Sequence, residues 1–371
     1  MTWDEGATLA ERFRAHAGER EHLYGYAMRG MAADWEAGGA VRQVCAGYED
    51  APSGSAIQLR LLAGVFRLVL DGRAPGLRPY YPCLGGREPP AAAWPVMQQV
   101  VAEHVEELRR ALAIAPQTNE VGRSAALLAG LFDLVQATGL TRVRLLEVGA
   151  SAGLNLLVDR MHLRGEGWQW GPPDSAVQLV DALIGPVHVV PFLVQDRAGC
   201  DLSTVDVTTA AGRQLLTSFV WPFDVHRHAR LAAALQLARQ HPVRVDRAGA
   251  SSWLPGELAR GGADPTVLTV VWQSVTQLYW PAEEVAAVER AVAAYGQRAR
   301  VARVTMEFDA PAPALSSGQL PAVRTQLWEP GEPEPRRRLV GTAHDHGIPV
   351  RLAPPDQDLG AVREASTDEG R

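Results

Sequence analysis

The sequence predicts an α/β fold in which a mainly parallel sheet follows an N-terminal helical region and closes with a β-hairpin. Three observations lead to this class. Apolar runs of strand length begin near residues 143, 198, 243, 266 and 301, with helical segments between them. Two more strand patterns, from about 323 and 338, are typical of a terminal hairpin. Residues 1–115 instead show apolar positions at helical spacing.

Composition limits the classes of partner. A chain of 371 residues can bury a large core, and its net charge of −6 offers no basic excess for nucleic-acid phosphates. Small molecules or proteins are the expected partners, and the sequence is compatible with a homodimer. All 36 basic residues are arginine. A Schiff-base lysine, a pyridoxal-phosphate anchor and a Walker lysine are therefore excluded.

Cysteine usage and hydropathy predict a cytoplasmic protein. Cys45, Cys83 and Cys200 are scattered, without the spacing of a disulfide framework or a zinc knuckle, so we expect reduced thiols and no metal site. The first residues are acidic and lack an apolar signal core. The longest apolar stretch, 57–70, is interrupted by arginines, so no membrane association is expected.

Three regions are predicted. Residues 1–115 form a helical cap that selects the substrate, 116–355 form the sheet domain with an insertion at about 160–196, and 356–371 form a loose tail. The cap contains a loop rich in Pro and Gly at 76–86. Its adjacent Tyr80 and Tyr81 are candidates for the wall of a substrate pocket. The alternative is that they only fill a core contact.

A glycine-rich turn organises the sheet domain. The apolar run 143–148 reads as a buried strand, and Gly149, Ser151 and Gly153 follow before a helical pattern begins at residue 154. Glycines at such a turn accept positive φ and let a ligand approach the N–H groups of the next helix. Two chemistries fit: a cofactor cradle preceded by Glu147, or the Gly-x-Ser-x-Gly elbow of a hydrolase with Ser151 as nucleophile.

An acid ends the next predicted strand. Asp201, followed by Leu202, can accept hydrogen bonds from both hydroxyls of a ribose. It lies 52 residues after Gly149, where about 20 are expected for a plain βαβ unit, so the intervening segment must be an insertion. The alternating pattern at 168–179 suggests that this insertion is a β-hairpin.

Further polar residues are expected around the same crevice. Asn119 and Arg123 lie in a polar segment before the turn, where Arg123 could grip a carboxylate; the alternative is a helix N-terminus capped by Thr118 or Asn119. The strand near 266 ends in polar and aromatic residues. In an open sheet the carboxyl ends of strands line the ligand crevice, so the residues expected to face it are Gln273, Ser274 and Tyr279.

These motifs resemble known families. The segment from Glu147 to Asn155 resembles the first motif of class I S-adenosylmethionine-dependent methyltransferases, with Ser151 in place of the middle glycine. The resemblance implies a Rossmann-like sheet and S-adenosylmethionine as cofactor. It implies cofactor binding by Glu147, Gly149, Ser151, Gly153, Asn155, Asp201, Leu202 and Ala250. Gln273, from its place at a strand end, and Arg123, from its guanidinium, are further candidates for cofactor binding. Gly249 stands where an acid commonly meets the adenine, so recognition would fall to backbone around Ala250.

A second resemblance covers most of the chain, from about residue 13 to 351. The blocks 117–124, 146–155, 199–206, 220–222 and 271–275 are similar to an uncharacterised bacterial family, domain of unknown function 2332. That family implies no substrate.

Together these patterns predict a methyltransferase acting on a small molecule, with His344 and His346 as candidate general bases. One alternative is an inactive binding protein on the same fold, motivated by Ser151 and Gly249. Another is a serine hydrolase using Ser151, Asp309 and a histidine of the pair; residues 1–142 lack the earlier strands and oxyanion loop it needs. The substrate, the methyl-acceptor atom and the oligomeric state are not specified.

Overall fold

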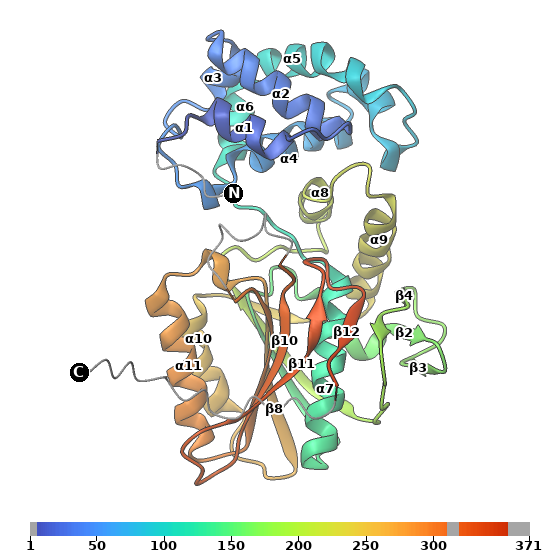
Figure 1. Ribbon diagram of the computed structural model, residues 1–371, viewed down its shortest axis with the longest axis vertical. Helices are drawn as coiled ribbons and strands as arrows, with labels where there is room; N and C mark the ends of the chain where they lie inside the picture. Colours follow the sequence, from blue (N-terminus) through green and yellow to red (C-terminus); the bar gives the residue numbers. More distant parts are fainter. Residues whose placement is uncertain (1–5, 310–318, 355–371) are drawn as a thin grey trace, which may run out of the picture. The chain divides into compact units, whose positions relative to one another are not determined.

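The computed structural model describes residues 6–309 and 319–354 and shows a mixed α/β protein with a large, mostly parallel sheet (Figure 1). Contacts divide the described residues into two compact units. The helical unit contains 6–120, 205–241 and 319; the sheet unit contains 121–204, 242–309 and 320–354. The expected boundary near 115 therefore omitted a second helical segment, 205–241. The predicted loose tail, 356–371, lies outside the described residues.

The helical unit confirms the helical periodicity of residues 1–115. Its elements are α1 Leu9–Ala17, α2 Leu23–Glu36, α3 Ala40–Val44, η1 Ser53–Ser55, α4 Ile57–Leu70, η2 Pro75–Tyr80, η3 Pro82–Leu84, η4 Pro90–Ala92, α5 Ala93–Glu103, α6 Val105–Leu112, α8 Ala210–Ser218 and α9 Val225–Gln240. The first helix begins with a capping box: the Thr8 side chain accepts from Glu11 N, and the Glu11 carboxylate accepts from Thr8 N.

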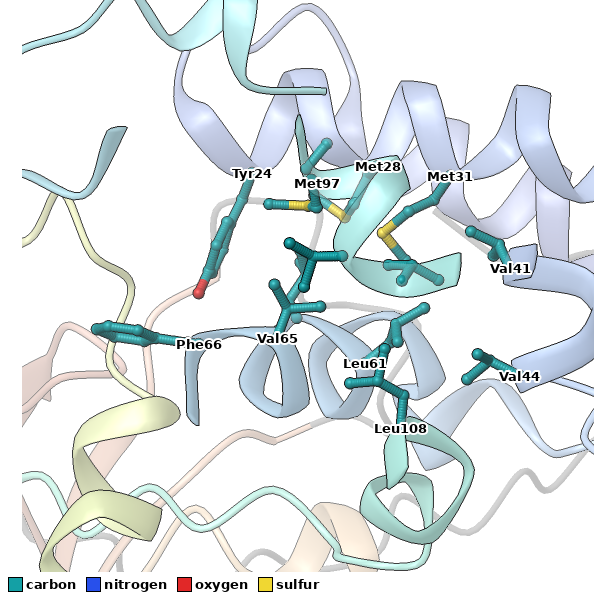
Figure 2. Packing of buried hydrophobic residues seen from close by; sticks show 14 of the residues in the cluster. Tyr24, Met28, Met31, Val41, Val44, Leu61, Val65, Phe66, Met97 and Leu108 are labelled. Carbon is teal, nitrogen blue, oxygen red and sulfur yellow. The ribbon is translucent and has the colours of Figure 1, made fainter. Parts of the chain in front are cut away.

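Helix α4 supplies the centre of this unit's apolar core. Its residues Leu61, Val65 and Phe66 are fully buried and lie among methionines of α2 and α5, such as Met28 and Met97 (Figure 2). The thioether side chains adapt to the irregular gaps between short helices. Spacing of three to four residues along α4 places these positions on one face, which explains why the periodicity was visible in the sequence.

The sheet unit contains a nine-stranded sheet. Its strands are β1 Arg142–Val148, β5 Leu183–Ile184, β6 Leu193–Asp201, β7 Arg244–Arg247, β8 Val267–Ser274, β9 Val301–Glu307, β10 Ala322–Trp328, β11 Arg336–Ala343 and β12 Val350–Leu352, in the order β5-β12-β11-β10-β9-β8-β1-β6-β7. The five strands β7, β6, β1, β8 and β9 are parallel to one another, and β10 pairs antiparallel with β9. Strands β10 and β11 pair antiparallel, which confirms the predicted hairpin.

Helices cover both faces of this sheet. Helix α7, Ser124–Thr138, packs against β9 and β10, while α10, Ala250–Arg260, and α11, Ala282–Gly296, lie together on the other side (Figure 1). Buried apolar side chains of β1, β6 and β8 form one core with those of α10 and α11. Strands covered on both faces explain the nearly continuous apolar runs in the sequence.

The insertion between β1 and β6 is a separate three-stranded sheet rather than a simple hairpin. Its strands are β2 His162–Gly165, β3 Trp168–Trp170 and β4 Gln178–Val180, in the order β3-β2-β4. The hairpin is β2–β3, and β4 pairs parallel with β2. The expectation of a hairpin within 168–179 is therefore wrong in its pairing, because β3 pairs with the preceding strand β2 and not with β4.

Candidate functional site

The glycine turn lies at the carboxyl end of β1. Its residues Gly149, Ser151 and Gly153 all have positive φ, of 72°, 54° and 70°. The N–H groups of Gly149 and Ala150 both donate to the Cys200 carbonyl, at 2.9 and 3.0 Å, which ties the turn to the end of β6. The element that follows is a short 3₁₀ helix, η6 Leu154–Arg160, rather than a regular α-helix.

Protein atoms occupy the space left by two of these glycines. A Cβ atom at Gly149 would overlap the methyl group of Thr276, and one at Gly153 would lie 2.7 Å from a methyl of Val243. The turn thus needs glycine for close packing against the loop after β8 and the start of β7. This differs from the expectation that the missing Cβ atoms leave room for a ligand.

Asp201 connects the turn to the end of β6. Its Oδ2 accepts from Ser151 N at 2.9 Å and its Oδ1 from Ser203 N at 2.8 Å. Each carboxylate oxygen retains a second lone pair that could accept a ligand hydroxyl. The next side chain, Leu202, is 72% exposed. The structure therefore brings Ser151 and Asp201 together, at the ends of β1 and β6.

Glu147 is a buried carboxyl group of this site with a raised pKa. It is 2% exposed, its Oε1 lies 3.5 Å from Asn155 Nδ2, and its Oε2 has no hydrogen-bond partner among the described residues. Asn155 in turn accepts from Ser124 Oγ at 2.8 Å. Burial is the main cause that raises the pKa of Glu147 to about 8, and Asp201 raises it further, while Asn155 and Arg123 oppose the shift.

A buried indole flanks Glu147. Trp272 occupies the paired position on β8 and is fully buried. Its N–H favours the charged form of Glu147, although the two groups form no hydrogen bond of ordinary geometry. Glu147 Oε2 and Trp272 Nε1 thus lie towards the carboxyl ends of β1 and β8. Neither atom has a hydrogen-bond partner among the described residues.

Arg123 joins two loops above the ends of the strands. It lies in η5, Val121–Arg123, where its Nε donates to Asp345 O at 3.0 Å and its Nη1 donates to Ser274 O at 3.3 Å. The guanidinium is buried and donates to two backbone carbonyls. Contacts with the loops therefore replace, in part, the expected hydrogen bonds to a ligand carboxylate.

The contact between Arg123 and the Asp345 carbonyl also positions the loop that carries the candidate general bases His344 and His346. Gly347 packs directly on the backbone of Arg123, so the β11–β12 loop lies beside η5. His344 of this loop is exposed, and His346 is half-buried with Nδ1 3.8 Å from Asp345 Oδ1. The structure therefore places both histidines near Arg123 and the end of β8.

Gln273 is part of a buried polar network. It is 0% exposed; its Oε1 accepts from Arg303 Nη2 at 2.7 Å and its Nε2 donates to Glu307 Oε1 at 3.1 Å. This corrects the expectation that Gln273 faces an open pocket. Ser274 is nearly buried, with its carbonyl held by Arg123, and Tyr279 is 62% exposed.

Sequence reasoning missed Glu307, at the end of β9. Its Oε1 accepts from Thr276 N, Thr276 Oγ and Gln277 N as well as from Gln273, at 3.0 to 3.4 Å. These bonds hold the loop in which Val275 has a φ of 51°, an unusual value for a β-branched residue. Burial raises the pKa of Glu307. The available signal was an acid at a strand end, the same pattern that identified Asp201.

The start of α10 is occupied by an acid from α11. Ser251 N donates to Glu284 Oε1 at 2.9 Å and Ser251 Oγ donates to Glu284 Oε2 at 2.5 Å. Ala250 itself is buried. One of the backbone N–H groups expected to meet an adenine is thus already bonded within the protein.

The remaining predicted residues belong to the helical unit. Tyr81 is 0% exposed and its ring lies 4.7 Å from that of Phe66, and Tyr80 packs against the same core. These positions agree with the alternative that the two tyrosines fill a contact in the core. Asn119 is buried in the last residues of the unit before its boundary.

Two features of the described residues, 6–309 and 319–354, concern metal and membrane binding. No group of three His, Cys, Asp or Glu residues there could hold a metal ion. Within the same ranges, every helix is too short or too polar to cross a membrane.

The fold and site define a mixed α/β protein whose polar groups converge at the carboxyl ends of parallel strands. Residues 7–351 match the model of a family described as an uncharacterised protein conserved in bacteria, DUF2332. The chain belongs to this family. No curated protein matches it.

Proposed function

We propose that the protein is an S-adenosylmethionine-dependent methyltransferase acting on a small molecule, on a Rossmann-like sheet. The order of the strands in the nine-stranded sheet is the observation that supports this proposal. The parallel strands β7-β6-β1-β8-β9, numbered by their place in the chain, have the order 3-2-1-4-5 of doubly wound folds, in which ligands bind where the order reverses. The glycine turn and Asp201 lie at the carboxyl ends of the two strands on one side of that point.

The residues present can accommodate such a cofactor in part. The spare lone pairs of Asp201 suit ribose hydroxyls, and the unbonded Glu147 Oε2 offers a hydrogen-bonding atom beside the turn. Against this, Glu284 already bonds Ser251 N at the expected adenine position. We assign ribose binding to Asp201 and the methionine side to the turn.

S-adenosylmethionine would supply an electrophilic methyl group, and the chain would contribute mainly orientation of the acceptor. Ser274 and Tyr279 are the candidate substrate contacts on the β8 side. His344 or His346 would accept the proton from the nucleophile, since their loop is fixed beside Arg123.

Calorimetry with S-adenosylmethionine tests the proposal. The wild-type chain should bind, and Asp201→Ala should weaken binding at least tenfold. Asp264→Ala is a matched control, because Asp264 also accepts from the backbone N–H two residues later, at 2.9 Å, but precedes the amino end of β8. The control should bind like the wild type.

Three results would count against parts of this proposal. Absence of binding by a folded wild-type chain rejects the cofactor. Binding that Asp201→Ala leaves unaltered rejects the ribose assignment. Binding without transfer to any methyl acceptor favours the alternative of an inactive binding protein.

One observation favours a serine hydrolase as a second candidate. Ser151 has a positive φ, as expected for a nucleophile on a strained turn. The proposed acid Asp309 is instead paired with Arg324 at 2.7 Å. Labelling by a fluorophosphonate probe that disappears in Ser151→Ala would support the hydrolase; no labelling, or equal labelling of both forms, would reject it.

A further inference from the structure

The loop after β8 contains a residue in a strained backbone conformation. Val275 has a φ of 51°, in the left-handed region that β-branched residues avoid. Such a conformation persists only where the surrounding structure fixes it, and conformations of this kind cluster at binding and catalytic sites. The contacts that fix Val275 therefore indicate what this loop does.

The chain before Val275 is fixed by the sheet and by a buried guanidinium. Val275 N donates to Met306 O at 2.9 Å, which continues the parallel pairing of β8 with β9. The preceding carbonyl, Ser274 O, accepts from Arg123 Nη1 at 3.3 Å. The chain therefore leaves the sheet at Val275 itself.

A carboxyl group from the neighbouring strand holds the chain after Val275. Glu307 is the last residue of β9 and is 4% exposed. Its Oε1 accepts from Thr276 N at 3.0 Å, from Thr276 Oγ at 3.2 Å and from Gln277 N at 3.4 Å. Three donors of two consecutive residues thus converge on one oxygen atom. Removing that oxygen would release the loop directly after its strained residue.

The loop held by Glu307 contacts the glycine turn. A Cβ atom at Gly149 would overlap the methyl group of Thr276, so the two segments already touch. They follow β1 and β8, which are adjacent parallel strands. The strand order reverses between these two strands, and ligands of doubly wound sheets bind at that point. The position of Thr276 therefore limits how far the turn can move.

We propose that Glu307 is a positioning residue, which fixes the strained loop after β8 and, through Thr276, keeps the glycine turn in the conformation that binds the cofactor. The identity of the cofactor rests on the proposed function. The link between Glu307 and the turn does not, because it follows from contacts within the chain.

Amide hydrogen exchange of the full chain without cofactor tests this link. The N–H groups of Gly149, Ala150 and Ser151 are hydrogen-bonded, so their exchange reports opening of the turn. Dividing their protection by that of β1 corrects for changes in global stability. Glu307→Ala should lower this ratio at least tenfold. Glu307→Gln, which keeps an oxygen acceptor at the same position, should lower it less than threefold.

Two substitutions at Thr276 separate its contact with the turn from its bonds to Glu307, and they serve as the test if Glu307→Ala does not fold. Thr276→Ser keeps the hydroxyl group but removes the methyl group that touches Gly149, and should lower the ratio at least threefold. Thr276→Val keeps a methyl group there and should have a smaller effect. The control is Glu257→Gln, because Glu257 is a buried carboxylate bonded to Arg144 in the first half of β1. It should not lower the ratio.

Calorimetry with S-adenosylmethionine tests the consequence for binding. Glu307→Ala should weaken binding at least fivefold, and Glu307→Gln less than twofold. The proposal is overturned if Glu307→Ala and Thr276→Ser leave the exchange ratio unchanged, or if the ratio falls while the affinity stays that of the wild type. If the wild-type chain does not bind S-adenosylmethionine, the proposed function fails by itself, and the exchange ratios alone decide whether Glu307 positions the turn.

Discussion

Burial shifts the pKa of histidines in the helical unit and of glutamates in the sheet unit. In the helical unit, burial lowers the pKa of His16 to about 4 and also lowers those of His22 and His228. In the sheet unit, burial raises the pKa of Glu147 to about 8 and raises that of Glu307. Burial disfavours the charged form in each case. The same physical cause therefore gives the units opposite responses to pH.

The direction follows from proton linkage. Below its ordinary pKa a histidine is protonated in the unfolded chain, so stability from neutral His16 is lost as the pH falls from 6.5 towards 4. Glu147 binds its proton more tightly when folded, so its contribution is lost as the pH rises from 4.5 through 8. Acid should loosen the helical unit and alkali the sheet unit.

The largest expected effect comes from comparing one ion pair in each unit. In the sheet unit, Arg144 and Glu257 are buried and 2.6 Å apart. We expect Glu257→Ala to lower the free energy of unfolding by about 3–5 kcal/mol, because the buried Arg144 keeps the half-exposed Asp196 as its remaining carboxylate partner. Glu36→Ala removes the exposed Arg14–Glu36 pair of the helical unit and should cost less than about 1 kcal/mol. Urea unfolding measures both; equal losses would contradict the contrast.

The second prediction concerns Glu147. Wild-type protection of the sheet unit should fall by about 2–4 kcal/mol between pH 5 and pH 9, and Glu147→Gln should remove most of this dependence. Hydrogen exchange, corrected for intrinsic rates, reports the two units separately. The helical unit should not respond to this substitution. An unchanged pH dependence in Glu147→Gln would assign the effect to Glu307 or another group.

The sequence predicted this fold better than its polar interior. Strands expected from about 143, 198, 243, 266, 301, 323 and 338 begin at 142, 193, 244, 267, 301, 322 and 336, because a doubly covered sheet produces apolar runs of its own length. The sequence does not show which polar side chains pair with one another in the interior. Gln273 sits in a strand end typical of a pocket, and only the distant Arg303 and Glu307 make it a core residue.

The site was predictable where local conformation dictated it. Positive φ at Gly149 and Gly153 follows from a tight turn between a strand and a helix, and the Asp201 contact follows from adjacent parallel strands. The aromatic cluster around Trp221 was not predictable. It joins His16 of α1 and Tyr24 of α2 to Trp221 and Phe223, and no periodicity links regions so far apart in the chain.

The third prediction compares two glycines of the sheet unit with similar φ. Gly149 and Gly139 have φ of 72° and 69°, but only Gly149 lacks room for a Cβ atom. Gly139→Ala should cost about 1 kcal/mol from backbone strain, while Gly149→Ala should cost about 2–3 kcal/mol because Thr276 must also move. Thermal unfolding measures both changes. Equal losses of unfolding free energy would show that the loop after β8 shifts without a measurable cost.

The smallest effect tests the helical unit's acid response. His16 Nδ1 lies 2.7 Å from Gln58 Nε2 and its ring lies 6.0 Å from that of Trp221, an arrangement that favours the neutral form; Arg20 and His22 also oppose its protonation. His16→Gln should therefore reduce the loss of helical-unit protection between pH 7 and pH 5 by about 1–2 kcal/mol, discounted for partial exposure. The exposed His226 gives the control, His226→Gln, which should leave that loss unchanged. If His16→Gln remains as acid-sensitive as the wild type, the response belongs to His22 and His228, and the contrast between the units then rests on the aromatic cluster around Trp221.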